Sequence, residues 1–184
     1  MLKKLMILNI LLFSVPSWGS ITCIFKTKNQ CLLTAARTGN AELANTLVSE
    51  GADMNARNKK GQTPLMLAAY DGYYNVVKYL VAIGADVNAR DNVGYTALMG
   101  GSSGGYIALT VLLISAGANI NEQDIQGRTA LMLTADRGFL RVVDYLVSNG
   151  ADVNARDNVG HTALKYAERA GHSDVVKALI SYRN

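Results

Sequence analysis

The chain has 184 residues, enough for one ordinary domain with a substantial core, and 49% of them are apolar. Charged residues make up 17%, and the formal net charge is +4. Without Lys3 and Lys4 the balance falls to 16 basic against 14 acidic residues, and no later basic run is longer than Lys59-Lys60. This balance argues against nucleic acid as the partner.

Residues 1–19 have the order of a secretory signal peptide. A basic pair at residues 3–4 precedes an apolar run over residues 5–15, and the small residues Ser17 and Gly19 follow. This order predicts cleavage after Gly19 and export of the remaining chain.

Two alternatives to a cleaved leader stay open. One is an uncleaved membrane anchor over residues 5–25, and the other is an apolar tail that is not exported. Asn9 and Pro16 weaken the anchor, because a membrane-spanning helix needs about 20 predominantly apolar residues.

The two cysteines, Cys23 and Cys31, follow directly after this leader. Export would permit a disulfide between them across a short loop. The alternative is a buried, reduced Cys31 with no role for Cys23. Their spacing, with no histidine nearby, argues against a metal site.

A repeat of 33 residues organises the rest of the chain. The ten residues 85–94 recur unchanged at 151–160, an offset of twice 33. A Thr-(Pro/Ala)-Leu triplet recurs at 63–65, 96–98, 129–131 and 162–164. Such a period indicates stacked supersecondary units, which bind through an extended surface.

Residues 58–90 show how one unit is built. A polar turn leads to Thr63, whose hydroxyl can cap a helix, and Pro64 fits the first helical position. Gly72 ends this helix, and a second apolar helix ends at Gly84. Helices of two to three turns are unstable alone, so their apolar faces must be buried against the next unit.

Two sets of residues recur in register and would align along the stack. The leucines that would pack between units are Leu65, Leu98, Leu131 and Leu164. The asparagines that would bond turn backbone groups are Asn55, Asn88, Asn121 and Asn154.

With these motifs the chain resembles the ankyrin repeat family. The family pattern D-x-x-G-x-T-P-L-H-x-A-A-x-x-G…V-V-x-x-L-L-x-x-G-A-D-V-N is met most fully at 58–89. The resemblance implies an all-α, right-handed solenoid of helix-turn-helix units joined by short β-hairpin or turn connections. It divides residues 20–184 into an N-terminal capping repeat, three full repeats and a C-terminal capping repeat, at 25–57, 58–90, 91–123, 124–156 and 157–184.

Two features depart from the family pattern. The histidine that usually follows T-P-L is replaced by Met66, Met99, Met132 and Lys165. The first helix of the third repeat contains four glycines over residues 100–105, each costing a helix about 1 kcal/mol relative to Ala. We expect this segment to be a weak point or hinge unless the flanking repeats support it, and Gly100→Leu with Gly101→Ala to stabilise it unless the neighbours have closed the gap.

No catalytic, cofactor or metal site is predicted. Residues 100–105 match the Gly-x-Ser-x-Gly pattern of hydrolases twice, but inside a helix rather than at a strand-to-helix turn. His161 and His172 lack the further ligands of a metal site, and His172 lies where the family places a structural histidine. No small-molecule substrate is therefore expected.

The resemblance places partner binding on the turn tips and the exposed side of the first helices, on the concave face. Tyr and Arg are the commonest binding hot spots. We expect Tyr95 and Arg128 to project from this face without packing in the core. The predicted contact residues are Lys59, Lys60, Gln62, Tyr70, Tyr95, Arg128, Arg137 and His161.

We interpret the chain as an exported bacterial protein, periplasmic or secreted, that acts as a non-enzymatic protein-interaction module. The alternatives are a membrane-tethered scaffold with an uncleaved leader, a periplasmic protector or inhibitor of another protein, and a secreted factor that engages host proteins. Contact with a membrane is expected only if the leader persists.

Export gives the first testable prediction. Protein isolated from its native cell should begin near Ser20, because the basic, apolar and small-residue order directs cleavage after Gly19. Intact-mass measurement with N-terminal sequencing checks this. An intact Met1 on the isolated protein would contradict it.

Overall fold

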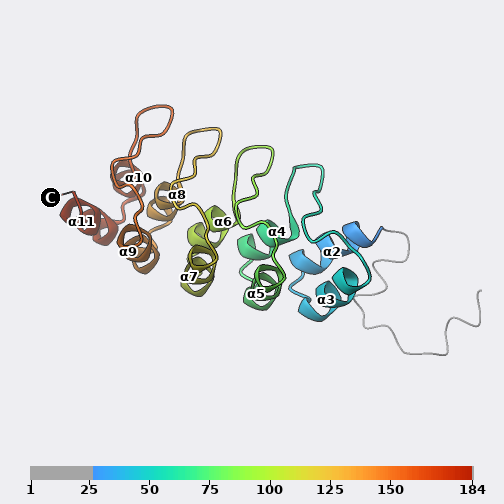
Figure 1. The fold of residues 1–184 in the computed structure, drawn as a ribbon. Helices are drawn as coiled ribbons and strands as arrows, with labels where there is room; N and C mark the ends of the chain where they lie inside the picture. Colours follow the sequence, from blue (N-terminus) through green and yellow to red (C-terminus); the bar gives the residue numbers. More distant parts are fainter. Residues whose placement is uncertain (1–26, 184) are drawn as a thin grey trace, which may run out of the picture.

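The computed structural model describes residues 27–183, and over that range the chain forms ten helices and no strand. They follow one another as five pairs, and one pair makes one repeat (Figure 1). The pairs are α2 (Lys28–Arg37) with α3 (Ala41–Ser49), α4 (Pro64–Tyr70) with α5 (Tyr74–Ala82), α6 (Ala97–Ser103) with α7 (Ile107–Ser115), α8 (Ala130–Arg137) with α9 (Leu140–Ser148), and α10 (Ala163–Ala170) with α11 (Ser173–Ser181). Within the described range, no helix has both the length and the apolar character needed to cross a membrane.

The repeats stack so that their helices form two rows. The first helices, α2, α4, α6, α8 and α10, pack side by side in an inner row, and the second helices form an outer row against it (Figure 1). Each helix therefore contacts its own partner and the equivalent helices of adjacent repeats. The result is the all-helical solenoid that the repeat pattern predicted.

The loops between repeats project from one side of the stack, and we call them fingers (Figure 1). They comprise residues 50–63, 83–96, 116–129 and 149–162. A side chain at the start of each tip holds it closed: Asp91 Oδ1 accepts the backbone N–H groups of Val93 and Tyr95, at 3.0 and 2.8 Å. Asn58, Asp124 and Asp157 do the same in the other fingers. The connections are thus turns, and the described residues do not form the β-hairpin strands that were the other expectation.

Hydrogen bonds join each finger to the next. The Oδ1 atoms of Asn55, Asn88 and Asn121 accept the backbone N–H of a residue in the following repeat, at 2.9, 2.8 and 2.8 Å. Nearer the tips, the Asn92 N–H donates to the Lys60 carbonyl at 3.0 Å. The predicted asparagine ladder is confirmed for these three residues, whereas Asn154 lies in the last finger and has no following finger to bond.

The helix starts and the core also repeat in register. Thr63, Thr96 and Thr129 accept the backbone N–H of the methionine three residues on, at 3.3, 3.2 and 3.4 Å. These are N-caps, each worth about 1 kcal/mol. Leu65, Leu98 and Leu131 are at most 2% exposed. Leu164 is only half-buried, because its repeat has a neighbour on one side alone. The three methionines are buried as well.

The glycine-rich segment forms an ordinary helix, α6, whose residues 97–102 are all buried. Its neighbours have closed the gap that the missing side chain would leave. A Cβ on Gly100 would lie 3.2 Å from Tyr70 Cα and 3.3 Å from Tyr70 N, closer than side chains normally approach a backbone. A Cβ on Gly101 would instead make ordinary contacts of 3.5 Å with Leu109 and Leu113. The condition on which a leucine at position 100 was expected to stabilise the stack is therefore not met.

These distances separate two substitutions. Gly101→Ala should stabilise the protein by up to about 1 kcal/mol, because it raises helix propensity without a clash. Gly100→Leu should destabilise it by about 1 to 3 kcal/mol, because the side chain must displace the Tyr70 backbone. Urea unfolding of both variants measures this. A stabilising Gly100→Leu would mean that the two helices do not pack this closely.

Candidate functional site

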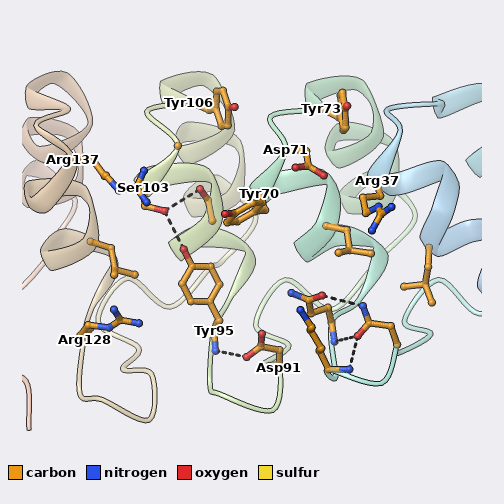
Figure 2. A pocket seen from close by; sticks show the side chains of 18 of the residues that line it. Arg37, Tyr70, Asp71, Tyr73, Asp91, Tyr95, Ser103, Tyr106, Arg128 and Arg137 are labelled. Carbon is orange, nitrogen blue, oxygen red and sulfur yellow. Dashed lines mark hydrogen bonds between the residues drawn. The ribbon is translucent and has the colours of Figure 1, made fainter.

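A groove runs between the fingers and the inner row of helices, from α2 to α8 (Figure 2). Its volume of about 1380 Å³ exceeds the roughly 300 to 1,000 Å³ typical of small-molecule sites. Residues from four repeats line it, and these residues, distant in the sequence, lie together only because the repeats stack. The shape suits a macromolecular partner better than a small ligand.

The groove collects seven of the eight residues predicted to contact a partner. Figure 2 shows several of them along its floor and finger side. The seven are Lys59, Lys60, Gln62, Tyr70, Tyr95, Arg128 and Arg137. His161 is not among the lining residues, because the groove ends at α8 and this histidine belongs to the following finger.

The residue just before each capping threonine contacts its own repeat. Gln62 Oε1 accepts a hydrogen bond from Asn58 Nδ2 at 3.0 Å. Arg128 binds Asp124 Oδ2 through Nη2 at 2.6 Å and through Nε at 2.8 Å. Since the Asp124 side chain is only 2% exposed, this pair stabilises the finger and leaves Arg128 less available to a partner.

Tyr95 occupies the same position in its repeat and packs partly against the core. Its hydroxyl lies 3.0 Å from Ser103 Oγ on α6. Burial raises the pKa of Tyr95, and the hydrogen bond with Ser103 offsets part of that rise. The expectation that Tyr95 does not pack in the core is therefore wrong, whereas Arg128 is half-exposed and does not pack in the core; both line the groove.

Other lining residues are free to meet a partner. Tyr70 is 62% exposed and lies between α4 and α6 (Figure 2). Arg137, Lys59 and Lys60 are exposed too, the first at the end of α8 and the lysines at a finger tip. These side chains can contribute contacts without losing internal bonds.

A row of aromatic rings that was not predicted from the sequence lies along the helix side of the groove. Tyr73, Tyr106 and Phe139 line it at 33-residue spacing, and His172 continues the series. Each ring lies over a glycine one repeat earlier, where any side chain would clash with it: a Cβ on Gly72 would lie 2.5 Å from Tyr106. The structural position noted for His172 could have revealed the other three, because they share its register.

His161 takes part in a cluster at the last repeat. Its Nδ1 lies 3.6 Å from Asp157 Oδ2, and the Tyr166 hydroxyl donates to the same oxygen at 2.8 Å. The Arg169 guanidinium lies 5.1 Å from the centre of the Tyr166 ring, close enough for a cation–π contact. The cluster fixes the last finger to α10.

Two pKa shifts follow from this cluster. Burial alone raises the pKa of Asp157, but hydrogen bonds from Tyr166 and from the backbone N–H groups of His161 and Val159 outweigh it, so the pKa lies below its ordinary value. Burial, and then donation to the Asp157 carboxylate, raises the pKa of Tyr166 to about 12.

The hydrolase-like serines are bonded within their own helix. Ser102 is fully buried and donates to the Leu98 carbonyl at 2.6 Å. Ser103 Oγ donates to the Met99 carbonyl at 2.6 Å. Both therefore serve the packing of α6.

Of the two cysteines, the structure describes only Cys31. It is 2% exposed and disulfide-bonded. Cys23 lies outside the described residues, as does the leader, so the predicted pairing and the predicted cleavage site stay predictions.

Comparison with known families agrees with the architecture. The model for ankyrin repeats (3 copies) matches residues 5–91, 32–124 and 98–184. No curated protein matches the chain. Because the family matches together cover nearly all of the sequence, the chain belongs to the ankyrin-repeat family, whose repeats are generally protein-interaction modules.

The cluster around Asp157 yields a prediction on stability and pH. Tyr166→Phe should destabilise the protein by about 1.5 to 3 kcal/mol near neutral pH, because it removes a hydrogen bond to a buried carboxylate. Asp157 has a lowered pKa in the folded state, so its contribution is present above its unfolded pKa of about 4 and is lost as the pH falls through the folded value. The loss caused by the substitution should therefore shrink on acidification below about pH 4.

Urea unfolding from pH 2 to pH 8 measures this difference, with Tyr145→Phe as the control. Tyr145 is half-buried whereas Tyr166 is buried, and the Tyr145 hydroxyl makes no hydrogen bond within the described residues. A penalty for Tyr166→Phe that is equal to the control, or the same at every pH, would disprove the coupling.

Proposed function

We propose that this protein is a non-enzymatic interaction module that binds a protein partner in the groove between its fingers and its inner helices. The groove carries this proposal, since it combines exposed Tyr70 with the exposed cations Arg137, Lys59 and Lys60 on a frame of fixed geometry. Aromatic and arginine side chains on a rigid surface are the usual source of protein-binding energy.

The frame also limits the cost of binding. The fingers are bonded to one another and the inner helices are packed, so few lining groups lose conformational freedom when a partner arrives. Affinity then depends on the exposed side chains, which differ from repeat to repeat, while the repeated frame stays the same.

We further propose that the protein works outside the cytoplasm, as a periplasmic or secreted factor of a bacterium. The leader at residues 1–19 supports this proposal. A protector or inhibitor that covers a site on another protein is one version of the same binding role. A membrane-tethered scaffold is the alternative, and it requires that the leader remain uncleaved.

Matched double variants test the groove. Tyr70→Ala with Arg137→Ala should weaken binding of the natural partner at least about tenfold, because each removes an exposed hot-spot side chain. Tyr74→Ala with Arg141→Ala removes the same residue types from the outer helices α5 and α9, where both are exposed, and should leave binding unchanged.

The partner is first captured by affinity purification from the native compartment, and its dissociation constants for both double variants are then measured. Circular dichroism and urea unfolding confirm that both variants are folded. If the outer-face pair weakened binding and the groove pair did not, the binding surface would lie on the outer helices.

A further inference from the structure

We propose that the partner of the groove is an extended, acidic polypeptide segment with one large apolar side chain near its middle. This inference rests on the proposed binding role. The distribution of charge, the centre of the groove and its length support this.

The charges of the groove are unevenly paired. Four lining cations, Arg37, Lys59, Lys60 and Arg137, make no ion pair within the described residues. Of the lining carboxylates, Asp91 Oδ1 is held by two backbone N–H groups and Asp136 lies 3.7 Å from Arg169. These hydrogen bonds do not cancel the charge of Asp91, so within the described residues four unpaired cations face two carboxylates without an ion pair, Asp71 and Asp91, and positive charge is in excess.

This imbalance is local to the groove. Over residues 27–183 the chain is nearly neutral, with 15 Lys and Arg against 14 Asp and Glu. Complementary charge across an interface raises the rate of association and selects between partners. A negatively charged partner is therefore favoured in the groove.

The side chains at the centre of the groove are smaller than those toward its ends. The positions that carry Tyr70 and Asp71 at the end of α4, and Asp136 and Arg137 at the end of α8, carry only Ser103 and Gly104 at the end of α6. Figure 2 shows Ser103 between Tyr70 and Arg137, with Tyr95 and Tyr106 on its two sides. A Cβ on Gly104 would lie 2.5 Å from Tyr106, so that ring covers Gly104 and the recess lies at Ser103, bounded by the three tyrosines. Such a recess suits a large apolar side chain.

The order of these features specifies the arrangement of the partner. Arg37 and Arg137 lie toward the two ends of the groove, and the recess lies between them (Figure 2). Neighbouring helices pack about 8 to 10 Å apart, so α2 to α8 span roughly 25 to 30 Å. An extended chain rises about 3.3 Å per residue, and about eight or nine residues would fill this length.

A peptide fits this pattern better than a nucleic acid. Single strands carry a phosphate at every nucleotide, and these would also face Asp71, Asp91 and Asp136. A peptide can place its carboxylates only opposite the cations and uncharged residues opposite the aspartates.

Selection from a library of random dodecapeptides displayed on phage, with the full-length chain as the target, tests the proposal. Peptides selected on the wild type should carry acidic residues on both sides of a large apolar residue. Synthetic copies should bind Arg37→Glu/Arg137→Glu at least about tenfold more weakly than the wild type, and should weaken with rising salt. Charge reversal on the outer helices, Arg141→Glu/Lys177→Glu, is the matched control and should have little effect.

The recess is tested separately with Ser103→Leu. A leucine there fills the space between the tyrosines, so it should weaken the same peptides about tenfold or more. Circular dichroism confirms folding. If a variant fails to fold, Tyr70→Ala, which removes an exposed wall of the recess, takes its place.

The outcomes separate this inference from the proposed function. The proposal of an acidic peptide would be overturned if the selected peptides bound in the groove but carried no excess of acidic residues. It would also be overturned if a dT12 oligonucleotide bound more tightly than the peptides. If binding of the captured protein required Tyr70 and Arg137 but no selected peptide bound in the groove, the proposal of an extended peptide segment would be overturned. The proposed binding role would still hold. If the groove variants bound both the peptides and the captured protein as tightly as the wild type does, the inference and the proposed function would both be overturned.

Discussion

An asparagine side chain reaches from each finger to the backbone of the next repeat, and this bond sets the geometry on which the groove depends. Asn55, Asn88 and Asn121 each complete it at 2.8 to 2.9 Å. The helices are too short to be stable singly, and their leucines pack only when adjacent repeats are in register. Packing alone would tolerate small slips along the apolar faces, whereas a directional hydrogen bond does not. The fingers therefore lie at fixed spacing, and so do the side chains that they present to the groove.

The repeat pattern was sufficient to predict the fold because each unit repeats the same helix-capping, core and turn residues. Thr63, Thr96 and Thr129 start helices in the way that their position implied, and three leucines are buried in one line. Such features depend on residues close in sequence and on identical neighbours. The positions of the helices and the way they stack could therefore be predicted from the sequence.

The site was harder to predict, because a shared position does not imply a shared role. Tyr95, Arg128 and His161 occupy equivalent places, yet their partners are Ser103, Asp124 and Asp157. The period cannot distinguish a side chain that turns inward from one that faces solvent, since that depends on what lies within a few ångströms. Gly100 is a similar case: the sequence shows a missing side chain, but only the distance to the Tyr70 backbone shows that no space is left.

The rings over the glycines have a consequence for how the chain can change over generations. Gly39, Gly72, Gly105 and Gly138 all have φ between 72° and 81°, a region that side chains disfavour. Each also lies beneath a ring of the next repeat, supplied by Tyr73, Tyr106, Phe139 and His172. Within this one molecule the glycine is constant while the ring takes three chemical forms. Mutation can therefore vary the chemistry of one edge of the groove in single steps, without a compensating change in the frame beneath it.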